Sequence, residues 1–197
     1  MTIHSKIPSI GLGTYMMSPE EAEEMTYEAI KIGYRHIDTA EVYRNEQGVA
    51  KGIERSLSEG LVSRSELFIT TKVFPGNEIW GQSQKTFDDV TESLDNSLKR
   101  LKLEYVDLYL IHSAHANKTR IEQWKALLEL KSMGKITYAG VANWNIKHLQ
   151  EINDADLPLP DTNQIELHPW AQQPELVEYL QNNNVHIIAY SSLVPLS

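Results

Sequence analysis

A carboxylate and a phenol lie close together in one short stretch of the sequence, GYRHIDTAEVYRNE at residues 33–46. His36 and Asp38 fall on one face of a predicted strand that ends at Asp38, and Tyr43 lies in the loop that follows. In several parallel α/β architectures, the carboxyl ends of the strands are where chemistry is done. The stretch therefore predicts an acid–base site, provided that other strand ends contribute to it.

Other strands predicted from short apolar runs also end in a residue that can ionise or form hydrogen bonds. The ends of successive strands are Asp38, Lys72, His112, Asn143, Gln164 and Tyr190. If the strands are neighbours in chain order, adjacent ends lie about 4.8 Å apart. Because packing alone does not explain six such ends in a row, we expect the first three side chains to line one mouth.

Lys72 connects this set to acid–base catalysis. A lysine in a partly buried mouth needs an anion near it, and Asp38 supplies one on the neighbouring strand. Because an ammonium group stabilises a phenolate, we expect Lys72 to lower the pKa of Tyr43 from about 10 toward the working range. Tyr43 then becomes a candidate general acid, and His112 can donate a hydrogen bond to a carbonyl oxygen.

A carbonyl group that gains a proton must also gain a nucleophile or a hydride at its carbon atom. The chain has no cysteine, and its sequence suggests no metal set, so a hydride from a bound cofactor is the economical choice. Asn143 and Gln164 offer the donors and acceptors that a carboxamide needs, and Tyr190 offers a flat face for a planar ring. The strand ends thus favour a hydride-transfer enzyme.

These side chains require a framework of alternating strands and helices. Apolar residues at helical spacing predict six helices, near 18–32, 45–59, 84–101, 119–133, 146–155 and 174–183. Short apolar runs before and between them predict seven strands, and such alternation implies a parallel sheet. The sheet is either open and doubly wound or a closed barrel of eight units with one missing. Gly11 and Gly13 open a dinucleotide-binding fingerprint that Met16 interrupts, which disfavours the open sheet.

Composition narrows the classes of partner. The formal net charge of −9 argues against a protein that binds mainly nucleic acid or an anionic membrane surface. The sequence shows no secretory leader, and no apolar run in it is long enough to span a bilayer. We therefore expect a monomeric protein of the cytoplasm that acts on a small molecule.

Seven motifs in a characteristic order cover nearly the whole chain. They are GLGTY at 11–15, GYRHIDTAEVYRNE at 33–46, LFITTKV at 67–73, LEYVDLYLIH at 103–112, GVANWN at 140–145, NQIELHP at 163–169 and AYSSL at 189–193. In these motifs the sequence resembles the aldo-keto reductase family. The resemblance implies an eight-stranded parallel (β/α)8 barrel of the TIM type that reduces aldehydes and ketones to alcohols with NADPH.

The resemblance also assigns roles to residues. The family's catalytic tetrad falls on Asp38, Tyr43, Lys72 and His112, with Tyr43 as the proton donor. Its cofactor contacts fall on Asn143, Gln164 and Tyr190, with Thr14 near the nicotinamide ring, Ser191 and Leu193 near the pyrophosphate, and Asp38 shared between the two sets.

The chain departs from the family's pattern in three places. Ala142 stands where many relatives have serine, which removes one hydroxyl contact to the carboxamide of the cofactor. Ser113 stands where many have tryptophan, which suggests a more open and polar substrate pocket. The third departure is the end of the chain at SLVPLS, just past the seventh strand. We therefore expect residues 1–197 to form one barrel domain that lacks the eighth strand and C-terminal helices and belongs to a longer polypeptide. By itself the chain should bind the cofactor weakly.

Other interpretations of the same residues remain open. Lys72 could form a Schiff base in a different barrel enzyme, or the barrel could bind a nicotinamide nucleotide without useful turnover. A metal site at His112 and His115 lacks a third ligand, and we interpret His36 as structural. Three tryptophans either wall the substrate pocket or pack between loops: Trp80, Trp144 and Trp170.

Overall fold

Strands and helices alternate along the chain in a computed structural model, which describes residue 3 and residues 6–194. The other residues of the expected 1–197 domain lie outside that description. The strands are β1 (Gly11–Gly13), β2 (His36–Asp38), β3 (Phe68–Val73), β4 (Val106–Ile111), β5 (Ile136–Ala142), β6 (Thr162–Glu166) and β7 (His186–Tyr190). The α-helices are α1 (Pro19–Lys31), α2 (Glu46–Ser58), α3 (Phe87–Leu101), α4 (Arg120–Ser132), α5 (Ile146–Asp154) and α6 (Pro174–Asn182).

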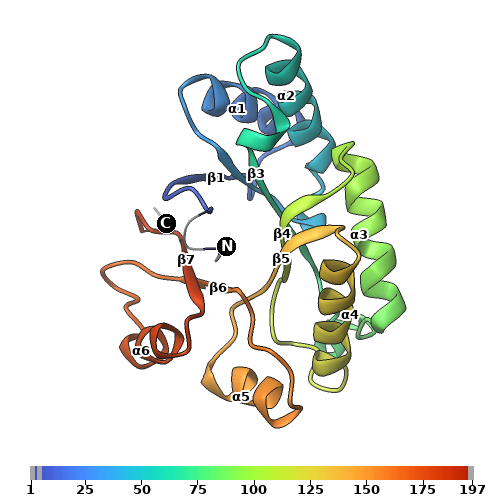
Figure 1. The fold of residues 1–197 in the computed structure, drawn as a ribbon, viewed down its shortest axis with the longest axis vertical. Helices are drawn as coiled ribbons and strands as arrows, with labels where there is room; N and C mark the ends of the chain where they lie inside the picture. Colours follow the sequence, from blue (N-terminus) through green and yellow to red (C-terminus); the bar gives the residue numbers. More distant parts are fainter. Residues whose placement is uncertain (1–2, 4–5, 195–197) are drawn as a thin grey trace.

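The seven strands form one parallel sheet in chain order, β1-β2-β3-β4-β5-β6-β7. The sheet curls so that its two ends turn back toward each other, and the helices lie on its outer side (Figure 1). This is a nearly closed barrel and not an open doubly wound sheet, because no strand is inserted out of order. The barrel prediction is confirmed for the part of the chain that the structure describes.

The first helix shows how local sequence sets an element. The side chain of Ser18 accepts a hydrogen bond from the backbone of Glu21, whose carboxylate accepts one from the backbone of Ser18, and Pro19 begins the helix. Gly33 follows the helix with φ +110°, a conformation that only glycine adopts readily. The first helix is therefore delimited by a capping box at its start and a glycine after its end.

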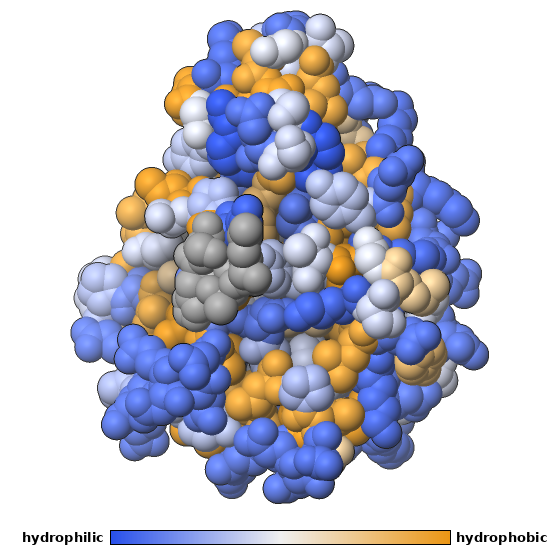
Figure 2. All heavy atoms as spheres, in the orientation of Figure 1, coloured by the Kyte–Doolittle hydropathy of each residue, from blue (hydrophilic) through white to orange (hydrophobic). Residues whose placement is uncertain are grey.

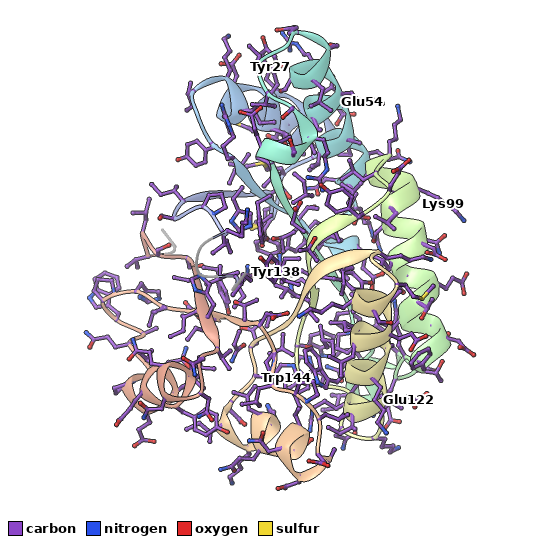
Figure 3. All side chains as sticks on the ribbon, viewed as in Figure 1. Tyr27, Glu54, Lys99, Glu122, Tyr138 and Trp144 are labelled. Atoms are coloured by element: carbon purple, nitrogen blue, oxygen red, sulfur yellow. The ribbon has the colours of Figure 1, made fainter. Side chains whose placement is uncertain are left out.

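Alternate residues of each strand face two different cores. One core lies between the strands and the helices, and it includes Ile69, Tyr109 and Trp124. The other fills the barrel, where Ile3 packs with residues such as Leu108. Figure 3 shows Tyr138 within the ring of strands, whereas Glu54, Lys99 and Glu122 extend outward from the helices. The central strands β3, β4 and β5 are therefore buried on both faces, as is usual in parallel sheets, whereas the edge strands β1 and β7 are partly exposed.

Neighbouring strands are staggered, so their ends are not level. Asp38 pairs with Thr70 on β3, and Lys72 on β3 pairs with Leu110 on β4. Lys72 therefore lies two residues beyond Thr70, the partner of Asp38. In the same way, His112 lies two residues beyond Leu110, the partner of Lys72. The expectation that equivalent strand ends sit side by side was wrong in register, because a barrel closes only when its strands are staggered.

One face of the molecule shows a mostly hydrophilic rim with apolar patches toward its middle (Figure 2). This distribution fits a helical layer whose outer surface meets water. Within the described residues, none of the helices combines the length and the apolar character that crossing a bilayer requires.

Candidate active site

Four polar side chains meet at the carboxyl end of the barrel. Lys72 lies near the end of β3 and forms an ion pair with Asp38, the last residue of β2. The Nζ atom of Lys72 lies 3.4 Å from the Oη atom of Tyr43, and that Oη atom lies 3.5 Å from Nε2 of His112. The structure thus brings Asp38, Lys72 and His112 together with Tyr43 from the segment after β2.

The ammonium group of Lys72 is fully buried and has three acceptors. It donates to Oδ1 of Asp38, to the carbonyl oxygen of Thr39 at 2.9 Å and to Oη of Tyr43 at 3.4 Å. An ammonium has three N–H groups, so each has a partner. Two of these partners belong to β2 and the residue after it, and they orient the third N–H group toward the phenol.

Tyr43 is held in place by the short 3-10 helix η2 (Glu41–Tyr43), and not by an irregular loop as expected. The carboxylate of Glu41 accepts hydrogen bonds from the backbone of Phe74 at 2.6 Å and from Lys85 at 2.9 Å. Arg44, directly after Tyr43, adopts φ +57°, which ends the short helix. The segment that carries the phenol is therefore braced on both sides.

Asn45 ties this segment to the loop after β1, a role that sequence reasoning missed. Its fully buried amide donates to the carbonyl oxygens of Thr14 at 2.7 Å and Met17 at 3.1 Å, and it accepts from Thr39 at 3.0 Å. The residue before a helix normally caps it, yet the side chain of Asn45 makes no capping hydrogen bond to α2. The sequence offers no signal that separates these two roles.

The pKa of Tyr43 is raised, not lowered as predicted. Burial of the phenol is the largest cause, and the negative charge of Asp38 and the nearby Tyr15 add to it. The prediction considered the charge of Lys72 alone, whereas Asp38 neutralises that charge at close range. Tyr43 is therefore protonated throughout the neutral pH range.

His112 is neutral at physiological pH. Burial is the main cause that lowers the pKa of its imidazole to about 4; the charge of Lys72 acts in the same direction, and the charge of Asp38 opposes it. Its Nδ1 atom is buried without a hydrogen-bond partner, while Nε2 faces Tyr43. An imidazole in this state can donate one hydrogen bond without carrying a charge.

The three residues expected to contact a nicotinamide form hydrogen bonds with other residues of the protein. Nε2 of Gln164 donates to Oδ2 of Asp38 at 2.8 Å. Asn143 accepts from the Tyr190 hydroxyl at 2.8 Å and donates to the carbonyl oxygen of His112 at 3.1 Å. Gln164 is not the end of its strand, because β6 continues for two residues to Glu166. Asn143 and Gln164 nevertheless each bond a tetrad residue, and Tyr190 bonds Asn143.

The remaining cofactor candidates differ in exposure. Thr14 is fully buried, and its hydroxyl donates to the carbonyl oxygen of Asp38 at 3.2 Å. Ser191 and Leu193 follow β7 and are exposed, and Ser191 adopts φ +53°. Ser191 and Leu193 are therefore accessible to a ligand, whereas the buried side chain of Thr14 forms hydrogen bonds within the protein.

The three tryptophans have separate environments. Trp144 is buried beside α5, with the Arg120 guanidinium over its ring, so it packs between elements (Figure 3). Trp80 is 64% exposed; its ring lies nearly parallel to that of Phe74 with centroids 6.1 Å apart, and its centroid lies 5.5 Å from that of the tilted His115 ring. Trp170 is 82% exposed. Only Trp80 and Trp170 can offer a surface to a ligand.

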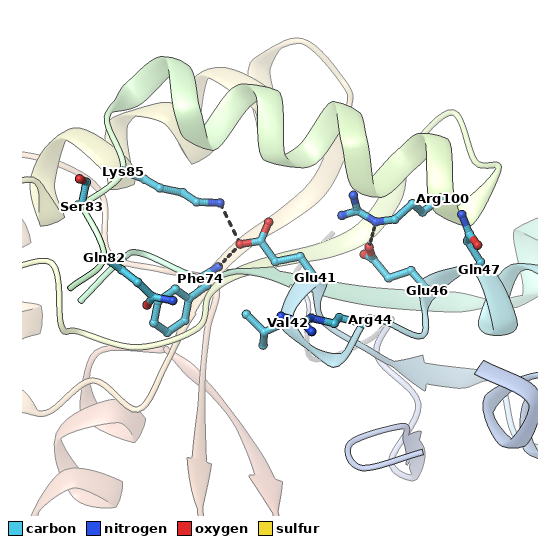
Figure 4. A pocket seen from close by; sticks show the side chains of 11 residues that line it. Glu41, Val42, Arg44, Glu46, Gln47, Phe74, Gln82, Ser83, Lys85 and Arg100 are labelled. Atoms are coloured by element: carbon cyan, nitrogen blue, oxygen red, sulfur yellow. Dashed lines mark hydrogen bonds and ion pairs between the residues drawn. The ribbon is translucent and has the colours of Figure 1, made fainter. Parts of the chain in front are cut away.

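A polar cavity of about 660 Å³ is lined by residues on both sides of Tyr43 in the chain and by no member of the tetrad. Figure 4 shows its lining side chains. Its lining residues are Glu41, Val42, Arg44, Glu46, Gln47, Phe74, Gly76, Gln82, Ser83, Lys85 and Arg100. Inside it Lys85 pairs with Glu41, and Arg100 pairs with the buried Glu46. These ion pairs link α3 and the loop before it to the segment around Tyr43. We therefore infer that the residues lining the cavity hold this segment in place.

Two histidines outside the tetrad have structural partners. His36 is buried in the barrel, with Nε2 2.9 Å from the Thr70 hydroxyl. His115 contacts Ser113 at 2.7 Å. In the part of the chain that the structure describes, no group of three or more histidine, cysteine, aspartate or glutamate side chains could hold a metal ion.

Comparison with known proteins adds an independent line of observation. The model of the Aldo/keto reductase family matches residues 9–194. A curated relative, methylglyoxal reductase DkgA of Yersinia pestis, is 41% identical over 192 residues, which are 97% of this chain and 64% of that protein. The chain thus spans slightly less than two thirds of that relative.

Solved structures agree with the sequence matches. An aldo/keto reductase from Brucella melitensis has a TM-score of 0.84 and 37% identity, over 97% of this chain and 71% of that one. An aldo-keto reductase of Bombyx mori in complex with NADP has a TM-score of 0.83 and 35% identity, over 94% of this chain and 62% of that one. The chain is therefore similar in both sequence and fold to solved aldo-keto reductases.

Proposed function

The chain belongs to the aldo/keto reductase family, and on that premise we propose that it reduces aldehydes or ketones to alcohols with NADPH, with Tyr43 as the general acid. The observation that carries this proposal is the buried ammonium of Lys72, which is shared between Asp38 and the phenol of Tyr43. This arrangement positions a neutral proton donor beside a fixed positive charge.

Tyr43 can donate its proton to a carbonyl oxygen on which negative charge develops. An alkoxide is a stronger base than a phenolate, so the transfer is favourable even though the pKa of Tyr43 is raised by burial. The phenolate that remains accepts a hydrogen bond from Lys72, whose charge stabilises it. Asp38 keeps the ammonium in this orientation throughout.

His112 helps to orient the carbonyl group. Because its pKa is lowered to about 4, its imidazole binds the oxygen as a neutral hydrogen-bond donor and leaves proton transfer to Tyr43. This requires the proton on Nε2, the nitrogen that faces Tyr43. Substrate oxygen would thus lie between the phenol and the imidazole.

The donor set near the tetrad fits a nicotinamide. The side-chain oxygen of Gln164 has no partner among the described residues and can accept from a carboxamide, and Asn143 and the ring of Tyr190 lie nearby. Ser191 and Leu193 are the exposed candidates for the pyrophosphate. When bound, NADPH supplies the hydride that reduces the carbonyl carbon.

The substrate is proposed to be a small carbonyl compound. The relative from Yersinia pestis carries the name methylglyoxal reductase, which makes a short dicarbonyl a natural first choice for assay. Phe74 and Trp80 follow β3, which carries Lys72, and His115 follows His112, so an apolar part of a substrate could rest on these rings. For the protein as a whole we propose a monomer of the cytoplasm.

The geometry disfavours the alternative in which Lys72 forms a Schiff base. A nucleophilic lysine needs an uncharged amine that can reach a carbonyl carbon. Here the side chain of Lys72 is fully buried, and each of its N–H groups has an acceptor, one of which is a carboxylate. We therefore give the lysine an electrostatic role.

The proposal is tested by following NADPH absorbance with methylglyoxal and with 2-naphthaldehyde, in the wild type and in Tyr43→Phe. The intact mass of the same sample is recorded, because the chain spans 64% of the curated relative. Tyr43→Phe is expected to lower the rate about 10²–10⁴-fold, since it removes the proton donor and keeps the ring.

Two results would contradict the proposal. One is a wild-type protein that binds NADPH but reduces no aldehyde, which would favour the nucleotide-binding scaffold. The other is a Tyr43→Phe variant with the wild-type rate, which would place the proton donor elsewhere. Trapping of a covalent adduct by borohydride would support the Schiff-base enzyme instead.

A further inference from the structure

One hydrogen bond crosses the interior of the barrel to the tetrad. Nε2 of Gln164 donates to Oδ2 of Asp38 at 2.8 Å, although the two residues lie 126 positions apart. Gln164 belongs to β6 and Asp38 to β2, and three strands separate these two in the sheet. The contact is therefore a property of the closed barrel and not of neighbouring strands.

The chemistry of the two groups determines how the amide is oriented. An ionised carboxylate only accepts hydrogen bonds, so it must face the amide nitrogen of Gln164 and not the oxygen. Gln164 is almost fully buried, so its side chain has little freedom to rotate. Its oxygen is consequently directed away from Asp38.

Asp38 in turn holds Lys72 through its other oxygen atom. Oδ1 bonds the ammonium while Oδ2 bonds Gln164, so the carboxylate is fixed between two donors. The ammonium also bonds the carbonyl oxygen of Thr39 at 2.9 Å, and its last N–H group faces Tyr43 at 3.4 Å. A continuous series of contacts thus runs from β6 through Asp38 and Lys72 to the phenol.

We propose that Gln164 is a positioning residue for the proton donor, which it serves by holding Asp38 from the opposite side of the barrel. This inference rests on the proposed function for its catalytic meaning and gives the residue a second role. The amide nitrogen serves Asp38, and the oxygen remains for the carboxamide of the cofactor. One side chain then links cofactor binding to the orientation of Lys72.

The inference is tested without cofactor, by carbon-13 NMR of aspartate carboxyl groups, with Asp38→Asn to assign the signal. In Gln164→Leu the carboxyl carbon signal of Asp38 is expected to move at constant neutral pH, because the carboxylate loses a charge-assisted hydrogen bond. In Gln164→Glu, which keeps the shape, the amide donor is lost as well, so the Asp38 signal also moves.

Gln123→Leu is the matched control. Gln123 is a fully buried amide on α4 whose Nε2 atom donates to the carbonyl oxygens of Pro75 and Lys85, both at 2.9 Å. Its loss should lower stability and leave the Asp38 carboxyl signal where it is in the wild type. A signal that moves equally in Gln123→Leu and Gln164→Leu would reduce the effect to general destabilisation and overturn the inference.

A second readout separates positioning from cofactor binding. Gln164→Leu and Asn143→Ala are both expected to weaken NADPH binding, but only Gln164→Leu should also lower kcat at saturating NADPH, because it alone releases Asp38. An Asp38 signal that is unchanged in both Gln164 variants would refute the inference. If the wild type reduces no aldehyde, the proposed function fails, while the NMR result still decides whether Gln164 holds Asp38.

Discussion

Replacement of Lys72 by methionine gives the sharpest test of the site. The side chain of Lys72 has 0% exposure and that of Asp38 has 14%, so the substitution leaves a nearly buried carboxylate without its counter-ion. Breaking one partner of a buried pair typically costs about 3–5 kcal/mol. Since Gln164 still donates to Asp38 at 2.8 Å, we expect the lower end, about 3 kcal/mol.

The double variant Asp38→Asn/Lys72→Met separates charge from shape. It removes both charges, so most of the lost free energy of unfolding should return. Recovery is incomplete because the carbonyl oxygen of Thr39 loses its donor in both variants. Urea unfolding followed by circular dichroism measures the free energy of unfolding of the wild type, the single variant and the double variant. The reductase activity of both variants should fall by at least about a hundredfold.

Lys118→Met is the control, because the ammonium of Lys118 pairs with Glu78 in solvent, with side chains 67% and 51% exposed. Exposed pairs contribute little, so this variant should unfold like the wild type. A Lys72→Met protein as stable as the control would refute the reasoning. So would a double variant that is as unstable as the single one.

Two further predictions concern pH and substrate range. His36 and His112 both have pKa values lowered to about 4, chiefly by burial, so the unfolded chain binds more protons from about pH 6.5 down to 4. The free energy of unfolding should therefore fall as the pH falls through this window, and less steeply in His36→Gln; an equal slope would contradict the prediction. Trp80→Ala should lower kcat/KM for 2-naphthaldehyde up to about tenfold through lost stacking, and less for methylglyoxal. Equal losses for both substrates would show that Trp80 acts on stability alone.

The rigidity of the site follows from the braces around it. Glu41 anchors η2 to the backbone of Phe74, and Asn45 joins the next residues to the loop after β1. Both side chains act on the segment that carries Tyr43, from opposite sides. A proton donor needs this control, because small displacements of a reacting group lower the rate strongly.

Local sequence was sufficient to predict the elements and their order. The helices near 18–32 and 146–155 were expected within two residues of their observed ends, since caps and helical periodicity are local properties. The tetrad candidates could be selected because parallel strands bring their carboxyl ends to one side. The spacing of residues along the chain was therefore sufficient to predict the α/β class and to select Asp38, Lys72 and His112 as candidate site residues.

The tertiary structure decided what each of these groups experiences. The raised pKa of Tyr43 depends on burial and on Asp38, which a pairwise view of Lys72 and the phenol cannot include. Trp144 is buried while Trp80 is exposed, although both lie in loops after strands. The stagger of the strands and the bond from Gln164 to Asp38 arise only when the sheet curls and brings β6 opposite β2. Contacts across a barrel join residues far apart in the chain, and no local pattern records them.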